Sequence, residues 1–122
     1  MKQEVIASMI DEIVEGIYEA YPILEEKYGE LGRKKCVEDN YHHFKHLDTA
    51  FSLNEEKLFI DYALWLNNIL TSRGMKVDHL IDNFERIIKV LHNEQTEEAE
   101  KYKMYLKSAI VTLKSEKQRK GQ

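Results

Sequence analysis

The scarcity of helix-breaking residues is the feature that most constrains this chain. Its 122 residues include one proline and five glycines, and three of the glycines lie within the first 32 residues. Glycine and proline interrupt regular structure more strongly than any other residues. A chain with so few of them favours long helices over many short strands. We therefore predict an all-α fold, formed by a single domain over residues 1–122 that is long enough to bury a core.

Charge and composition narrow the class of protein. The hydrophobic fraction of 43% and the charged fraction of 33% are typical of a soluble globular protein. The net charge of −4 argues against broad nucleic-acid binding, which needs clustered lysine and arginine. The single Cys36 cannot form an internal disulfide. The first residues lack the apolar run of a signal peptide, and no stretch approaches the ~20 apolar residues of a membrane span. We expect a cytoplasmic protein with no nucleic-acid partner and no membrane span.

The spacing of apolar residues divides the chain into five or six helices. We expect helices over residues 3–20, 23–28, about 31–51, about 55–73, 77 or 78 to about 92, and from about 97 to a frayed end. Pro22 separates the first two, and the turn 29–32 ends the short second one. Asn54 is the predicted N-cap of the helix over 55–73, and Gly74 is the predicted residue that follows its C-terminus.

Two of these helices carry the candidate core. The helix over 31–51 is expected to direct Val37, Tyr41, Phe44, Leu47, Asp48 and Phe51 inward, with Cys36 and His43 on the flank. The helix over 55–73 is apolar over more than half of its circumference, so we expect it to be central and contacted on several sides. Its apolar residues are Leu58, Phe59, Tyr62, Ala63, Trp65, Leu66, Ile69 and Leu70.

Candidate chemistry is sparse. Glu38, His42 and His46 are spaced by one helical turn each, which can suit a metal ion. They fall on the predicted outer face, however, and no second Glu-x-x-His motif completes a di-iron site. Surface histidines explain them better. The hypothesis that His46 accepts a phosphoryl group would be supported only by Thr49, three residues later. We find no nucleotide loop, nucleophile motif or carboxylate pair, so we predict that the protein is not an enzyme.

An internal pocket is the sharper hypothesis, and ordinary core packing is its alternative. His43 leans toward the core, where it is either a hydrogen-bonded core histidine or a polar group at a pocket, and both readings remain open. Arg73 is either a helix-terminal cation or an anion ligand, with Asp48 as a possible partner. Large rings on several helices can pack solidly or leave a slot that an apolar ligand fills. These rings belong to Phe44, Phe51, Phe59, Tyr62, Trp65, Phe84, Tyr102 and Tyr105.

Three short runs resemble a known family. They are HFKHL at residues 43–47, FIDYALWL at 59–66 and LTSRG at 70–74. The chain resembles the haemless globin-like sensor-domain proteins of Bacillus anthracis that inhibit sporulation, which are similar to the sensor domain of a sporulation histidine kinase. The likeness extends over residues 6–86. A similar His…Asp-Tyr-x-x-Trp…Arg-Gly pattern also precedes cobalamin-binding domains, so it indicates a sensor fold more than one ligand.

The resemblance implies a globin-like homodimer of five to six helices without haem. It further implies a fatty acid in an apolar tunnel, a chloride ion nearby, and inhibition of sporulation by competition with a histidine kinase for its signal. By motif position, Asp61 joins His43, Tyr62, Trp65 and Arg73 near the pocket. The predicted ligand-binding residues are His43, Phe44, Leu47, Phe59, Tyr62, Trp65, Leu66, Arg73, Phe84 and Tyr102. Three alternatives remain: a haem-binding globin sensor, a metal or phosphotransfer protein that uses His42 and His46, and a helical dimerisation module without ligand.

Overall fold

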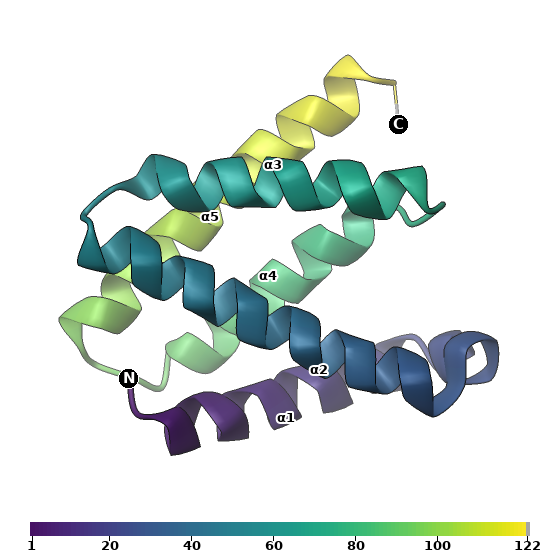
Figure 1. Ribbon diagram of the computed structural model, residues 1–122, viewed down its shortest axis with the longest axis horizontal. Coiled ribbons are helices and arrows are strands. Elements are labelled where there is room, and N and C mark those ends of the chain that lie inside the picture. Colours follow the sequence, from purple (N-terminus) through teal and green to yellow (C-terminus); the bar gives the residue numbers. More distant parts are fainter. Residues whose placement is uncertain (122) are drawn as a thin grey trace. The chain divides into compact units, whose positions relative to one another are not determined.

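All regular structure in residues 1–121, the part of the chain that the computed structural model describes, is helical (Figure 1). The helices are α1 (Gln3–Ala20), α2 (Ile23–Ser52), α3 (Glu56–Ser72), α4 (Val77–Leu91) and α5 (Glu97–Arg119). The predicted all-α class is confirmed, and the helix bounds agree closely with those expected from the sequence. None of the described helices combines the length and the apolarity that crossing a lipid bilayer requires.

A kink at Gly29 explains why α2 was expected as two helices. Gly29 has φ 62° and ψ −154°, a combination that is essentially restricted to glycine. The short predicted helix and the long one are both present and are joined across this single residue. The break is therefore sharper than the predicted turn over residues 29–32, and helical geometry resumes directly after Gly29.

The two ends of α3 are built differently from each other, and one differs from the prediction. Glu55, not Asn54, is the N-cap residue. Asn54 instead adopts a left-handed φ of 51°, which asparagine tolerates better than most residues, and its N–H donates to the carbonyl of Phe51 at 3.1 Å. At the other end, Gly74 follows the C-cap with φ 87°, as predicted. The N–H of Met75 donates to the carbonyl of Leu70 at 3.1 Å, which completes a Schellman-type end.

The chain divides into two compact units, Met1–Lys45 and His46–Gln122, and the boundary falls within α2. The first unit holds α1 and most of α2. Arg33 links these helices, because its guanidinium lies 4.8 Å from the centroid of the Tyr18 ring and forms an ion pair with Glu15. The buried residues of α1 recur at helical spacing, as its sequence predicted, and are Met9, Ile10, Ile13, Val14 and Ile17.

The second unit consists of the end of α2 together with α3, α4 and α5. Helix α5 packs against both α3 and α4, and Figure 1 shows it crossing α3 obliquely. Two polar contacts fix the same pairs of helices: Ser108 donates to Glu56 at 3.1 Å, and Lys117 pairs with Asp78 at 2.6 Å. The fully buried apolar residues of α3, α4 and α5 include Phe59, Ala63, Phe84, Ile87, Leu91, Leu106, Ala109 and Leu113.

Candidate functional site

The predicted ligand-binding residues lie in both units. His43 and Phe44 belong to the first unit, and the other eight belong to the second. Most of them are buried, as expected for core or pocket positions: His43, Phe44, Leu47, Phe59, Tyr62, Phe84 and Tyr102. Leu66 is half-buried, whereas Trp65 and Arg73 are exposed.

Trp65 corrects the expected position of the only tryptophan. Its side chain is 59% exposed, so it does not belong to the buried aromatic cluster. Leu58, two turns earlier on the same side of α3, is 38% exposed. The buried side of α3 instead carries Phe59, Tyr62, Ala63 and Asn67. Helix α3 is thus covered on one side by the described chain, not on several sides as its apolar circumference suggested.

The buried rings of the second unit pack against one another. The centroid of the Phe59 ring lies 5.7 Å from that of Tyr62 and 5.3 Å from that of Phe84. Rings at such distances are in contact, so Tyr62 and Phe84 each pack on Phe59 with no slot between their rings and the Phe59 ring. The hypothetical slot for an apolar ligand therefore does not run between Phe59 and either of these rings.

The sequence predicted that Glu38, His42 and His46 form a line on the outer face of the helix. His46 departs from this prediction. His46 is half-buried, and its imidazole stacks on the ring of Tyr62 with centroids 3.8 Å apart. His42 is exposed. Across residues 1–121, no group of three or more histidine, cysteine, aspartate or glutamate side chains is arranged to hold a metal ion. The one-turn spacing of Glu38, His42 and His46 thus creates no metal site in the described residues.

The buried side of α2 is rotated relative to the predicted one. Tyr41 and Asp48 were expected to face inward, but both are exposed. The buried positions are Asn40, His43, Phe44, Leu47 and Ala50. Two of these are polar: Asn40 donates from its amide to the backbone carbonyl of Cys36 at 3.0 Å, and His43 is only 1% exposed. The inward position of His43 is confirmed.

Tyr102 meets two carboxylates, one from α2 and one from its own helix. Its hydroxyl lies 3.4 Å from a carboxylate oxygen of Asp48 and 3.4 Å from one of Glu98. The single hydroxyl proton can be donated to only one of them at a time. Burial of the phenol, reinforced by the two negative charges, raises the pKa of Tyr102. Asp48 therefore contacts Tyr102. Arg73, which the sequence suggested as the partner of Asp48, lies exposed at the C-cap of α3.

Asn67 is a candidate functional residue that the sequence analysis missed. Its side chain is 4% exposed, and its Oδ1 atom is buried without a hydrogen-bond partner among the described residues. An unsatisfied buried acceptor costs about 1–3 kcal/mol, and such atoms are rare in folded proteins. The signal in the sequence was a polar residue at a helical spacing from Phe59 and Ala63, which placed an amide on the apolar side of α3.

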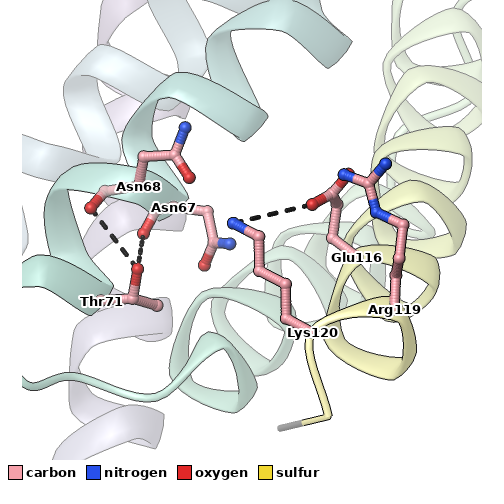
Figure 2. Close-up of polar contacts among 6 residues, drawn as sticks. All are labelled: Asn67, Asn68, Thr71, Glu116, Arg119 and Lys120. Carbon is pink, nitrogen blue, oxygen red and sulfur yellow. Dashed lines mark hydrogen bonds and ion pairs between the residues drawn. The ribbon is translucent and has the colours of Figure 1, made fainter.

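A lysine that follows the last residue of α5 points toward Asn67 (Figure 2). Figure 2 shows Lys120 extending toward the Asn67 amide, with its Nζ directed at Glu116. Glu116 accepts from Arg119 at 2.5 Å and pairs with Lys120 Nζ at 3.7 Å. The hydrogen bond from Arg119 is the main reason that the pKa of Glu116 is lowered. Lys120 makes the longer and therefore looser of the two contacts.

Comparisons with known proteins add no assignment. No protein-family model, no curated protein and no solved structure matches this chain.

Proposed function

We propose that the chain is a non-enzymatic sensor domain with a globin-like arrangement of helices, acting as a homodimer in the cytoplasm. It binds a fatty acid among the apolar residues around α3 and a chloride ion nearby. It inhibits sporulation by competing with a sensor histidine kinase for its signal. The support from the sequence is the resemblance of residues 43–47, 59–66 and 70–74 to such sensor domains.

The observation that carries the binding function is the uneven coverage of α3. Its residues are apolar over most of the circumference, yet the described chain leaves Leu58 and Trp65 on the exposed side. Contiguous exposed apolar patches mark binding surfaces for ligands or partners, whereas single exposed apolar residues are normal. We propose that Leu58 and Trp65 belong to such a patch. A helix of this composition is stabilised further when another apolar group covers that side.

The residues around the packed rings define the proposed contacts. Since Tyr62 and Phe84 each pack on Phe59 with no slot between the rings, the acyl chain is proposed to lie against the half-buried apolar residues of α3, among them Leu66. Arg73, a cation exposed at the end of the same helix, is the proposed ligand of the chloride ion.

Native mass spectrometry of protein purified under mild conditions tests the proposal. We expect a mass above that of the bare polypeptide by one fatty acid per chain, and we expect organic extraction to remove the excess. A mass equal to the polypeptide alone, with no uptake of added fatty acid after extraction, would contradict the proposal.

A dimerisation module without ligand is the second candidate, and one observation favours it. Met104 and Val111 are exposed on α5 at a two-turn spacing, as Leu58 and Trp65 are on α3. Two such pairs suit contact with a second copy of the chain. Sedimentation of the lipid-free protein separates the candidates. A dimer that forms without lipid and takes up none supports the module, whereas lipid uptake supports the sensor.

A further inference from the structure

We infer that Asn67 is the anchor for the carboxyl group of a bound acid, at the position on α3 toward which the side chain of Lys120 extends (Figure 2). The inference rests on the proposed function in one respect, because a fatty acid would supply this carboxyl group. Asn67 lies on the opposite side of α3 from Leu58 and Trp65, so the acyl chain of that acid would extend from Asn67 along Leu66. The inference goes further by assigning the headgroup to a specific residue that neither the sequence motif nor the aromatic cluster indicated.

The first step is the unmatched acceptor. Asn67 lies on the buried side of α3 with Phe59 and Ala63, and its Oδ1 atom has no partner among the described residues. It is the one buried side-chain nitrogen or oxygen in residues 1–121 for which this holds. Folded proteins pair almost all such atoms with protein groups or ordered water, so the expected partner of Oδ1 is a water molecule or a ligand donor that replaces it.

The second step is that the nearby hydroxyl donors of α3 are already engaged. The hydroxyl of Thr71 donates to the backbone carbonyl of Asn67 at 2.8 Å, and the hydroxyl of Ser72 donates to that of Ile69 at 2.7 Å. Figure 2 shows the Thr71 hydroxyl directed at the backbone carbonyls of Asn67 and Asn68 and not at the Asn67 side-chain amide. At the end of α5, Arg119 donates to Glu116, whereas Lys120, the residue after the helix, makes only a 3.7 Å ion pair with Glu116.

The third step is the chemistry of the missing group. A primary amide presents an acceptor, Oδ1, beside a donor, Nδ2. A protonated carboxyl group has the complementary pair, since its O–H donates to Oδ1 while its carbonyl accepts from Nδ2–H. An alcohol could satisfy only one of these bonds, and a carboxylate could not satisfy Oδ1 at all. Burial favours the neutral acid over the carboxylate, which suits this pairing.

The fourth step is access. Lys120 follows the last residue of α5, its side chain is 45% exposed, and its contact with Glu116 is long at 3.7 Å. In Figure 2 its aliphatic chain extends toward the Asn67 amide. A side chain at a helix end can swing into water at little cost. Displacement of Lys120 would therefore open Asn67 to a carboxyl group without disturbing the core.

A pair of asparagine variants tests the inference. Asn67→Leu removes the amide and retains the approximate volume, and we expect it to fold because it replaces an unsatisfied polar group by an apolar one. Asn68→Leu alters the adjacent, exposed asparagine and is the matched control. Decanoic acid, decanol and acetic acid are titrated at about pH 5, where a carboxyl group remains partly protonated. Binding is followed by calorimetry and by the side-chain NH₂ resonances of Asn67.

We expect both acids to shift the Asn67 NH₂ resonances more than decanol does, because an alcohol can make only one of the two bonds. We expect Asn67→Leu to weaken decanoic acid binding about tenfold, while Asn68→Leu leaves it unchanged. Acetic acid separates the headgroup from the acyl chain. If decanoic acid binds the native chain and Asn67→Leu equally, the inference is overturned and the proposed function stands. If acetic acid shifts the Asn67 resonances but decanoic acid does not bind, the carboxyl site stands and the fatty-acid function fails. If Lys120→Met alone shifts these resonances in ligand-free protein, lysine is the partner of Oδ1 and the inference is overturned.

Discussion

The imidazole of His46 lies face to face with the phenol ring of Tyr62, with centroids 3.8 Å apart and planes inclined by 12°. His46 lies near the end of α2, and Tyr62 lies on the buried side of α3. Tyr62 in turn contacts the ring of Phe59. The stack therefore connects the last turns of α2 to the aromatic core of the second unit.

We expect His46→Ala to destabilise the protein. Loss of a stacked ring pair costs about 0.5–1.5 kcal/mol in addition to the lost buried area. Urea unfolding followed by circular dichroism measures the change in the free energy of unfolding. His42→Ala, an exposed histidine on the same helix, is the control and should change it by less than about 0.5 kcal/mol. Equal effects of the two substitutions would show that the stack contributes nothing.

Trp65 and Phe84 are expected to differ sharply in their contribution to stability. Phe84 is fully buried against Phe59, so Phe84→Ala should cost about 3–5 kcal/mol. Trp65 is mostly exposed, so Trp65→Ala should cost less than about 1 kcal/mol in ligand-free protein. Thermal unfolding compares the two variants, and acrylamide quenching of the single tryptophan checks its exposure. A strongly protected indole in ligand-free protein would contradict the position of Trp65.

The helices were predictable because their ends depend on local chemistry. Pro22, Gly29 and Gly74 act on the residues beside them, and each lies at a break or an end in the structure. Asn54 shows the limit of this reasoning, because the same residue type suits both an N-cap and a left-handed position after a helix. In the structure Asn54 adopts the left-handed conformation after the end of α2 and is not an N-cap.

The candidate site was less predictable because burial depends on contacts between distant parts of the chain. Hydrophobicity alone gave α3 no single inward side, so Trp65 was placed in the core with Phe59. Asn67 was overlooked because a polar residue is not expected to be buried. Its burial follows from packing in the second unit, and its unmatched oxygen can be recognised only when the neighbouring donors are known to be engaged.

Thr96→Ala is expected to weaken the start of α5. Thr96 is the N-cap, and its hydroxyl accepts from the N–H of Ala99 at 3.0 Å. Loss of such a cap costs about 0.5–2 kcal/mol. Chemical denaturation measures the loss, and Thr96→Ser should retain most of the stability because serine caps equally well. Ser115→Ala, an exposed position later in α5, controls for the removal of a hydroxyl alone.

Cys36 should react slowly with alkylating reagents in the folded protein. Burial, reinforced by the charge of Asp39, raises the pKa of its thiol from 9.0 to about 11. Since only the thiolate is nucleophilic, two pH units correspond to a rate about a hundredfold lower near neutral pH than in the unfolded chain. Mass spectrometry of iodoacetamide adducts, in buffer and in urea, measures both rates. Similar rates in the two conditions would contradict the burial of the thiol.

The same shift gives stability a definite pH dependence. A thiol whose pKa is higher in the folded state binds its proton more tightly there than in the unfolded chain. Its contribution to the free energy of unfolding is therefore complete below pH 9.0 and is lost as the pH rises through about 11. Urea unfolding at several pH values should show a steeper decline over this interval for the native chain than for Cys36→Ala, which shares every other titrating group. Parallel declines would mean that the thiol titrates alike in both states, and slow alkylation would then reflect restricted access of the reagent alone.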